Sequence, residues 1–274
     1  MEIIPEKGFD FIKIDSHILE YNWIKKNSSP QTTLIFLHEG LGCVALWRNF
    51  PEQLAKASGC NAFVYSRAGY GASSPVSLPR SVDFMHKEAN ILETLIKQCA
   101  IDDFILVGHS DGASIALLYA GAENVKKPRA VILEAPHLFV EDCCLDAIRE
   151  ITETYDTTDF KDRLKRHHGE NTENAFRGWS GIWLNPEFRE WNIVEVLPSI
   201  TVPMLVIQGN DDQYGTLLQV EAVKNGAGGP VEVVLMPECG HSPHREQAEL
   251  TLNAMSAFIS SIQLRDNVTG KTPR

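Results

Sequence analysis

The chain has 274 residues, of which 43% are hydrophobic, so it is long enough to bury one large core. Its formal net charge of −11 disfavours nucleic acid and anionic membrane surfaces as partners. No apolar run approaches the roughly 18 residues of a membrane span, and residues 1–7 lack the pattern of a signal peptide, so we expect a cytoplasmic protein.

Apolar runs of strand length alternate with helical patterns along the chain. In chain order we expect a hairpin (9–14 and 17–23), a strand (32–37), a helix (50–57), a strand (62–65), a helix (83–98), a strand (104–107), a helix (113–120), strands (130–134, 204–208 and 231–236) and a closing helix (247–262). Continuous apolar strands that alternate with helices are typical of a parallel sheet covered on both faces.

One long segment interrupts this alternation. From about Pro136 to Pro198 the sequence is helical and polar, and it holds three of the five tryptophans. Because about 60 residues is far longer than a normal loop, we predict a helical lid (137–198) inserted into an α/β core (1–136 and 199–274). Most of its aromatic residues should form the lid's own core, and one or two, with Trp183 as first candidate, should line a substrate pocket.

The most informative motif is Gly108-His109-Ser110-Asp111-Gly112, which lies between an apolar strand and an apolar helix. A serine on such a sharp strand-to-helix turn is strained and exposes its hydroxyl, and the flanking glycines avoid collisions with neighbouring backbone. The alternative is an ordinary turn with a serine that caps the helix. We favour the nucleophile.

A serine needs a base to take its proton, and a carboxylate to orient that base. Two later strands end in suitable residues: Asp211 and Asp212 follow a glycine turn, and His241 follows the next strand. We expect the rival His244 to be a surface residue at the start of the closing helix. The order Ser, Asp, His is diagnostic of one convergent form of the triad.

These motifs resemble those of the α/β-hydrolase superfamily, over residues from about Leu34 to Ile262. The resemblance implies an α/β-hydrolase fold, with a mostly parallel twisted sheet, helices on both faces and an inserted helical lid. It also implies a triad of Ser110, His241 and an acid that commonly sits three residues after the turn glycine. That position is Asp212, with Asp211 as the alternative.

Two backbone amides should stabilise the negative charge that develops during acyl transfer. One is the amide of Asp111. The other should come from His38-Glu39-Gly40-Leu41-Gly42, where the family usually has His-Gly-x-x-Gly. Gly40 is the best donor, and Leu41 is the neighbour that could replace it and that we also expect at the substrate pocket. Glu39 replaces the usual glycine, and its carboxylate must either point away from this site or be paired.

A second loop, 66–73, resembles the superfamily's arginine-glycine turn. It could line the pocket, or it could support the site while Arg67 donates hydrogen bonds to carbonyl groups. We favour the supporting role.

The resemblance and the triad predict hydrolysis of a small-molecule carboxylic ester through an acyl-enzyme, without a metal or organic cofactor. The six cysteines lack metal-ligand spacing and should be free thiols. Charged residues across the lid, including the Lys-Arg-His-His cluster at 165–168 that we expect to be a solvated helix face, favour soluble short- to medium-chain esters over lipids. The triad leaves open a lactonase, a thioesterase, a meta-cleavage-product hydrolase or a perhydrolase, and also a ligand receptor that has lost catalysis. It does not define an oligomeric state.

Overall fold

The structure is a computed structural model that describes residues 9–25 and 32–269, with side chains up to residue 265. The strands are β1 (Asp10–Ile14), β2 (His17–Ile24), β3 (Thr33–Leu37), β4 (Asn61–Tyr65), β5 (Phe104–His109), β6 (Val131–Glu134), β7 (Met204–Gly209) and β8 (Val231–Met236). The α-helices are α1 (Phe50–Ser58), α2 (Phe84–Gln98), α3 (Asp111–Gly121), α4 (Asp142–Thr157), α5 (Phe160–His168), α6 (Thr172–Trp183), α7 (Leu217–Gly226), α8 (Pro243–Glu246) and α9 (Ala248–Thr269). Short 3-10 helices are η1 (Val44–Trp47), η2 (Gly169–Asn171), η3 (Pro186–Phe188) and η4 (Val194–Ser199). Within the described residues, no helix is long and apolar enough to cross a membrane.

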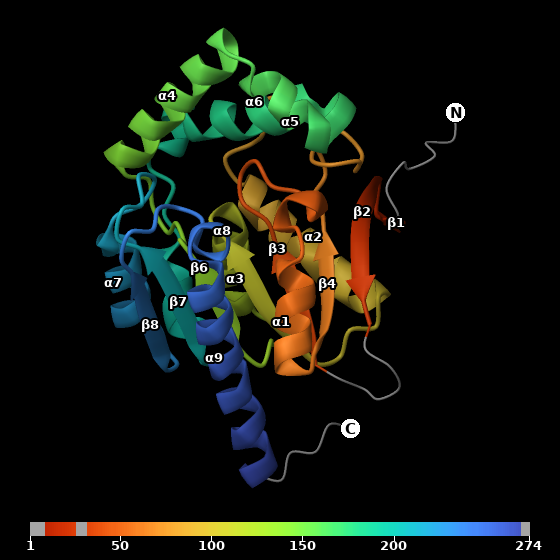
Figure 1. Ribbon diagram of the computed structural model, residues 1–274, viewed down its shortest axis with the longest axis vertical. Helices are drawn as coiled ribbons and strands as arrows, with labels where there is room; N and C mark the ends of the chain where they lie inside the picture. The colour runs from red at the N-terminus through yellow and green to blue at the C-terminus, as the bar shows by residue number, and fades with distance from the viewer. Residues whose placement is uncertain (1–8, 26–31, 270–274) are drawn as a thin grey trace.

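The described strands form one eight-stranded sheet in the order β1-β2-β4-β3-β5-β6-β7-β8 (Figure 1). Strand β2 runs antiparallel to β1 and β4, and every other neighbouring pair is parallel. The predicted hairpin and the mostly parallel sheet are therefore confirmed. Because parallel strands end at the same edge, the loops after β3, β5, β7 and β8 meet there, which is where open α/β sheets bind ligands.

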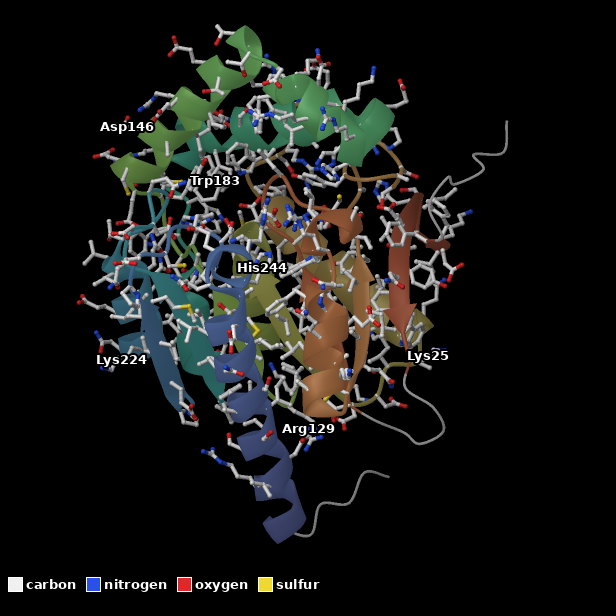
Figure 2. The ribbon with its side chains drawn as sticks, viewed as in Figure 1. Lys25, Arg129, Asp146, Trp183, Lys224 and His244 are labelled. Atoms are coloured by element: carbon white, nitrogen blue, oxygen red, sulfur yellow. The ribbon has the colours of Figure 1, made fainter. Side chains whose placement is uncertain are left out.

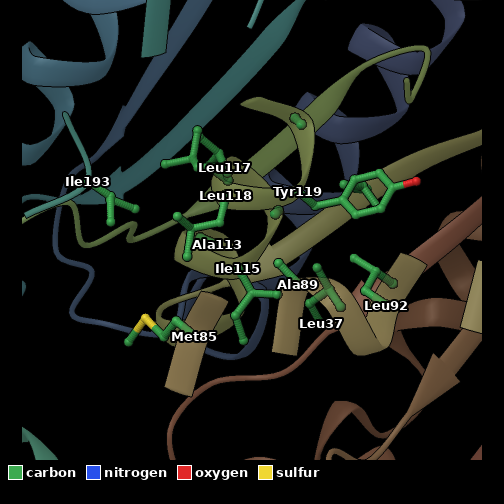
Figure 3. Close-up of a cluster of buried hydrophobic side chains, with 14 of the residues drawn as sticks. Leu37, Met85, Ala89, Leu92, Ala113, Ile115, Leu117, Leu118, Tyr119 and Ile193 are labelled. Carbon is green, nitrogen blue, oxygen red and sulfur yellow. The ribbon is translucent and has the colours of Figure 1, made fainter. Parts of the chain in front are cut away.

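Helices cover both faces of this sheet, as the continuous apolar strands predicted. Alternate strand residues enter two separate cores: Leu34 and Phe36 belong to one, and Ile35 and Leu37 to the other. Helices α1 and α9 pack side by side over the first core, and α2 and α3 over the second. Figure 3 shows the second core, where apolar side chains of β3, α2 and α3 meet. This burial fixes the direction in which α3 leaves β5.

The segment between β6 and β7 holds α4, α5 and α6, which we call the cap helices, and η2, η3 and η4. Its only β-pairing among the described residues is an isolated bridge between Phe139 and Asn192. The cap helices stand beyond the edge at which the parallel strands end (Figure 1). They have an aromatic core of their own, in which Tyr155 and Phe176 stack with ring centroids 3.7 Å apart. The division into a core and a lid at residues 137–198 stays a prediction.

The basic cluster at the end of α5 differs from the prediction. Lys165 and Arg166 are exposed, but His168 is buried and bridges two loops of the sheet domain. Its Nδ1 accepts a hydrogen bond from the amide of Gly71 at 3.0 Å, and its Nε2 donates to the carbonyl of Leu41 at 3.0 Å. Burial lowers the pKa of His168 to about 4, so this histidine is neutral and joins the cap helices to the loop after β3.

Candidate active site

Ser110 occupies the turn between β5 and α3 with φ 54° and ψ −119°, a backbone conformation that residues other than glycine rarely adopt. Two glycines make the turn possible. A Cβ on Gly108 would collide with the backbone of Gly112, and a Cβ on Gly112 would collide with the carbonyl of Leu37 in β3. Helix α3 can therefore begin at Asp111, the residue that follows the serine. The backbone amide of Ser110 donates to the carbonyl of Glu134 at 2.9 Å.

The structure brings Ser110, His241 and Asp212 together from the loops after β5, β8 and β7. His241 Nε2 lies 2.9 Å from Ser110 Oγ. His241 Nδ1 lies 2.9 and 2.8 Å from the two carboxylate oxygens of Asp212. The alternative acid, Asp211, is exposed, and its amide donates to Cys239 instead. Such a chain can move a proton from the serine hydroxyl to the imidazole while the carboxylate holds the ring.

Other hydrogen bonds hold Asp212 in place. Gln208 Nε2 donates to Asp212 Oδ2 at 2.7 Å, and the amide of Tyr214 donates to Oδ1 at 2.8 Å. Burial alone would raise the pKa of Asp212, but the charge and the hydrogen bond of His241 outweigh it and hold this pKa below its usual value. Gln208 was not predicted as a site residue, although a glutamine that ends the apolar run of β7 is a signal of a buried polar partner.

The fully buried side chain of Arg67 supports the loop after β3 through hydrogen bonds to its backbone. Its guanidinium donates to the carbonyls of His38 and Glu39, and it lies 3.8 Å from the carboxylate of Asp111. The ring of His38 adds two bonds, because its Nδ1 donates to the carbonyl of Glu39 and its Nε2 accepts from the amide of Arg67. This is the supporting geometry favoured for Arg67. It fixes the backbone that leads to Gly40.

A cavity of about 90 Å³ opens onto Ser110 and His241. The predicted residues Gly40, Leu41, Asp111 and Trp183 line it. Glu39 also lines the cavity, and five further lining residues were not predicted: His137, Cys144, Ile148, Trp179 and Tyr214. The indole of Trp179 packs directly on Gly40, so closely that a Cβ added to Gly40 would collide with the ring.

Besides Ser110, two of the lining side chains are polar and buried. Asp111 Oδ1 accepts a hydrogen bond from Trp183 Nε1 at 3.1 Å, and burial raises the pKa of this carboxyl although Arg67 opposes the shift. Burial, with a smaller effect of His241, lowers the pKa of His137 to about 3, so this histidine is neutral. The rest of the wall is mainly aromatic and aliphatic, which suits an apolar substrate group.

A second group of ionisable residues lies behind Ser110. His109, Glu134 and His244 are buried, and their possible ligand atoms lie within 4.8 Å of one another. His244 is therefore not a surface residue: its Nδ1 lies 2.8 Å from Glu134 Oε2. His109 Nε2 donates to the carbonyl of His241 at 2.7 Å, and its Nδ1 lies 3.6 Å from Glu39 Oε2. With their contacts to His241 and Glu39, these three residues form a buried network of hydrogen bonds and ion pairs. Of the two options for Glu39, the structure takes the paired one.

The fold, the elbow and the ordered triad are all features of α/β hydrolases. A sequence model described as the alpha/beta hydrolase family matches residues 34–254. The chain belongs to this family. A search of the curated proteins finds no significant match.

Many solved structures share the fold. One, from work on carboxylesterases of the thaumarchaeon Nitrososphaera gargenis, is 16% identical with a TM-score of 0.75, over 93% of this chain and 100% of that one. A proline iminopeptidase of Mycobacterium smegmatis is 16% identical with a TM-score of 0.69, over 94% of this chain and 99% of that one. A serine hydrolase involved in carbazole degradation is 19% identical with a TM-score of 0.70, over 92% of this chain and 98% of that one. At such identities the likeness shows the fold alone.

Proposed function

We propose that this protein is a serine hydrolase that cleaves small carboxylic esters through an acyl-enzyme. The observation that supports the proposal is the continuous hydrogen-bonded chain from Ser110 through His241 to Asp212, whose serine end opens onto an apolar cavity. Two structural neighbours, one from work on carboxylesterases of Nitrososphaera gargenis and the other a thermophilic esterase of Thermogutta terrifontis, agree with this choice of substrate.

In the proposed reaction, Ser110 Oγ attacks the ester carbonyl while His241 Nε2 takes the hydroxyl proton. The amides of Gly40 and Asp111 donate to the carbonyl oxygen as it becomes negative. Protonated His241 then passes its proton to the leaving alkoxide, and the alcohol departs. In the second half of the reaction, His241 takes a proton from a water molecule as this water attacks the acyl-enzyme. His241 then returns the proton to Ser110 Oγ as the acid departs. Asp212 holds the histidine ring and stabilises its charged form throughout.

The size and lining of the cavity support a short substrate. A volume of about 90 Å³ is well below the roughly 300 Å³ at which drug-sized ligand pockets begin. The wall around Trp179, Trp183 and Ile148 is apolar. We therefore expect esters of short acyl chains to react best, with medium chains accepted more slowly.

The test is an assay of the purified protein against p-nitrophenyl esters of increasing chain length, with a lactone and a thioester measured in parallel. Ser110→Ala should lose ester hydrolysis and keep its fold, whereas Ser260→Ala, at an exposed site on α9, should match the wild type. A phosphonate reagent should add once, on the peptide that contains Ser110. If Ser110→Ala kept more than about a hundredth of the wild-type rate, the proposed nucleophile would be wrong. A much faster reaction with the lactone or the thioester would show that this class of compound, and not the simple ester, is the preferred substrate.

A further inference from the structure

One imidazole spans two of the loops that carry the proposed chemistry. His109, the residue before Ser110, is fully buried. Its Nε2 donates to the backbone carbonyl of His241 at 2.7 Å, and its Nδ1 faces Glu39 Oε2 at 3.6 Å. The loops of Glu39 and His241 follow β3 and β8, which β5, β6 and β7 separate in the sheet. His109 therefore joins parts of the site that the sheet alone holds far apart.

The positions of these oxygens favour a charged His109. A neutral imidazole has one N–H and one bare nitrogen, and the bare nitrogen of His109 would then face the carboxylate of Glu39, which repels it. Only the doubly protonated ring presents an N–H to both the carbonyl of His241 and this carboxylate. Burial disfavours that charged form, but Glu39 outweighs burial and raises the pKa of His109 to about 9. In return, although burial opposes ionisation, His109 holds the pKa of Glu39 well below its usual range.

The other charged and titratable groups around His109 support this assignment. Glu134, at the end of β6, adds a second carboxylate and is paired with His244 of α8 at 2.8 Å. The rings of His241 and His244 lie 5.2 and 5.1 Å from that of His109, measured between centroids. His137 is the remaining titratable group that is close enough to interact electrostatically with His109. It is neutral, because burial lowers its pKa to about 3. The indole of Trp47 packs against the ring of His244, with centroids 4.5 Å apart.

We propose that the ion pair between Glu39 and His109 positions the loop 38–42, which carries the proposed donor Gly40 and which we call the oxyanion loop, against His241, so that both residues are positioning residues for acyl transfer. This inference rests on the proposed function. Glu39 acts through the backbone that leads to Gly40, and His109 acts through the carbonyl of His241. Errors of about 1 Å in such an arrangement can cost about a hundredfold in rate, so a charge pair at this point, with His109 buried and the Glu39 side chain 19% exposed, has a function besides stability. It also explains why a glutamate stands where related sequences usually have glycine.

The experiment compares Glu39→Gln, His109→Gln and the double variant with the wild type, from pH 6 to 10, on p-nitrophenyl acetate. The rate of the Ser110→Ala protein is subtracted as background. Glu52→Gln, an exposed position on α1, is the matched control for loss of one negative charge. In the wild type, kcat should fall as pH rises past about 9, because His109 loses the proton that faces Glu39.

In Glu39→Gln, kcat should fall about tenfold or more while KM changes less than about twofold, and the alkaline fall should move to lower pH because the imidazolium has lost its counterion. In His109→Gln the alkaline fall should disappear, because an amide donor does not titrate. The double variant should be no slower than the slower single variant, since both changes break one interaction. Glu52→Gln should match the wild type in every respect.

The inference is overturned if Glu39→Gln keeps the wild-type kcat, if the alkaline fall is the same in all variants, or if the two losses multiply. If Glu39→Gln does not fold, His109→Gln alone decides by the presence or absence of the alkaline fall. A wild type with no Ser110-dependent ester hydrolysis would contradict the proposed function and not the ion pair. Histidine NMR then decides: a ring that titrates near pH 9 in the wild type, and lower in Glu39→Gln, supports the pair, and a His109 that is neutral at pH 7 overturns it.

Discussion

The indole N–H of Trp183 donates to the carboxylate of Asp111 at 3.1 Å, so the last residue of α6 is tied to the residue after the proposed nucleophile. Figure 2 shows Trp183 beneath the cap helices, on the side that faces the sheet. The same ring packs against His137 and Phe188, each with centroids 5.2 Å apart. Trp183 therefore lines the cavity and also belongs to the hydrophobic core, the two roles between which its sequence position could not decide.

Trp183→Ala and Trp183→Phe should separate these roles. The alanine variant should lose about 3–5 kcal/mol of unfolding free energy and should shift the chain-length preference toward longer esters, because it enlarges the cavity. The phenylalanine variant keeps most of the packing and loses the hydrogen bond to Asp111, so its unfolding free energy should change less. Urea unfolding and kcat/KM across a series of esters measure both effects. An unchanged preference in a folded Trp183→Ala protein would remove Trp183 from the pocket.

Asp212→Asn and Asp211→Asn should differ strongly. An amide at position 212 presents the wrong hydrogen-bonding group to His241, so kcat should fall by about two to four orders of magnitude. Asp211 is exposed and contributes its backbone to the turn, so Asp211→Asn should change kcat less than about threefold. Steady-state kinetics on one short ester suffice. The opposite ranking would make Asp211 the acid.

Gly40→Ala should disturb the oxyanion loop. The added methyl group would collide with the indole of Trp179, so either the ring or the loop must move. We expect kcat to fall about tenfold or more, because the donor amide loses its position. Gly181→Ala is the matched control, since outside its own stretch of helix no heavy atom of the described residues lies within 4 Å of the added Cβ, and alanine favours the helix. Equal activity in the two variants would contradict a close role for Gly40.

Acid should weaken the fold through buried neutral histidines. His168 has a folded-state pKa of about 4, while the unfolded chain has the ordinary value of about 6.5. Because the unfolded state binds the proton first, stability is unaffected above about pH 6.5 and falls as pH drops from there toward 4; by pH 5 the loss from this residue is about 2 kcal/mol. Urea unfolding at pH 7.5 and 5.0 measures it. His168→Gln, whose amide can make both hydrogen bonds, should lose less stability over this range, and an unchanged pH dependence would show that other groups cause it.

The outer surface of α5 argues against activation at a lipid surface. Its exposed residues include Lys161, Asp162, Arg163, Lys165 and Arg166. An apolar face for insertion among lipid chains is absent from this part of the described chain. Hydrolysis of a triglyceride should therefore show no steep rise when substrate exceeds its solubility. Such a rise would point to a lipase.

The sequence predicted the parts of the site that depend on local pattern. Ser110, His241 and Asp212 each stand in a short motif at the end of an apolar strand, and the common edge of a parallel sheet brings such motifs together. The buried polar partners have no local pattern. Glu134 and His244 are 110 positions apart in sequence, and His168 of the cap helices contacts Leu41 over 127 positions. Such contacts depend on tertiary packing, which the order of residues within one segment does not specify.

The strained backbone of Ser110 sets the stability of the fold against the presence of the serine hydroxyl. A residue other than glycine with φ 54° and ψ −119° raises the free energy of the folded state by about 1–3 kcal/mol. Ser110→Gly should relieve this strain and unfold at higher temperature than Ser110→Ala, although both lack the hydroxyl. Under selection for thermal stability alone, the elbow would thus tend to lose its serine. A serine in this strained position is what we expect if the proposed chemistry needs its hydroxyl.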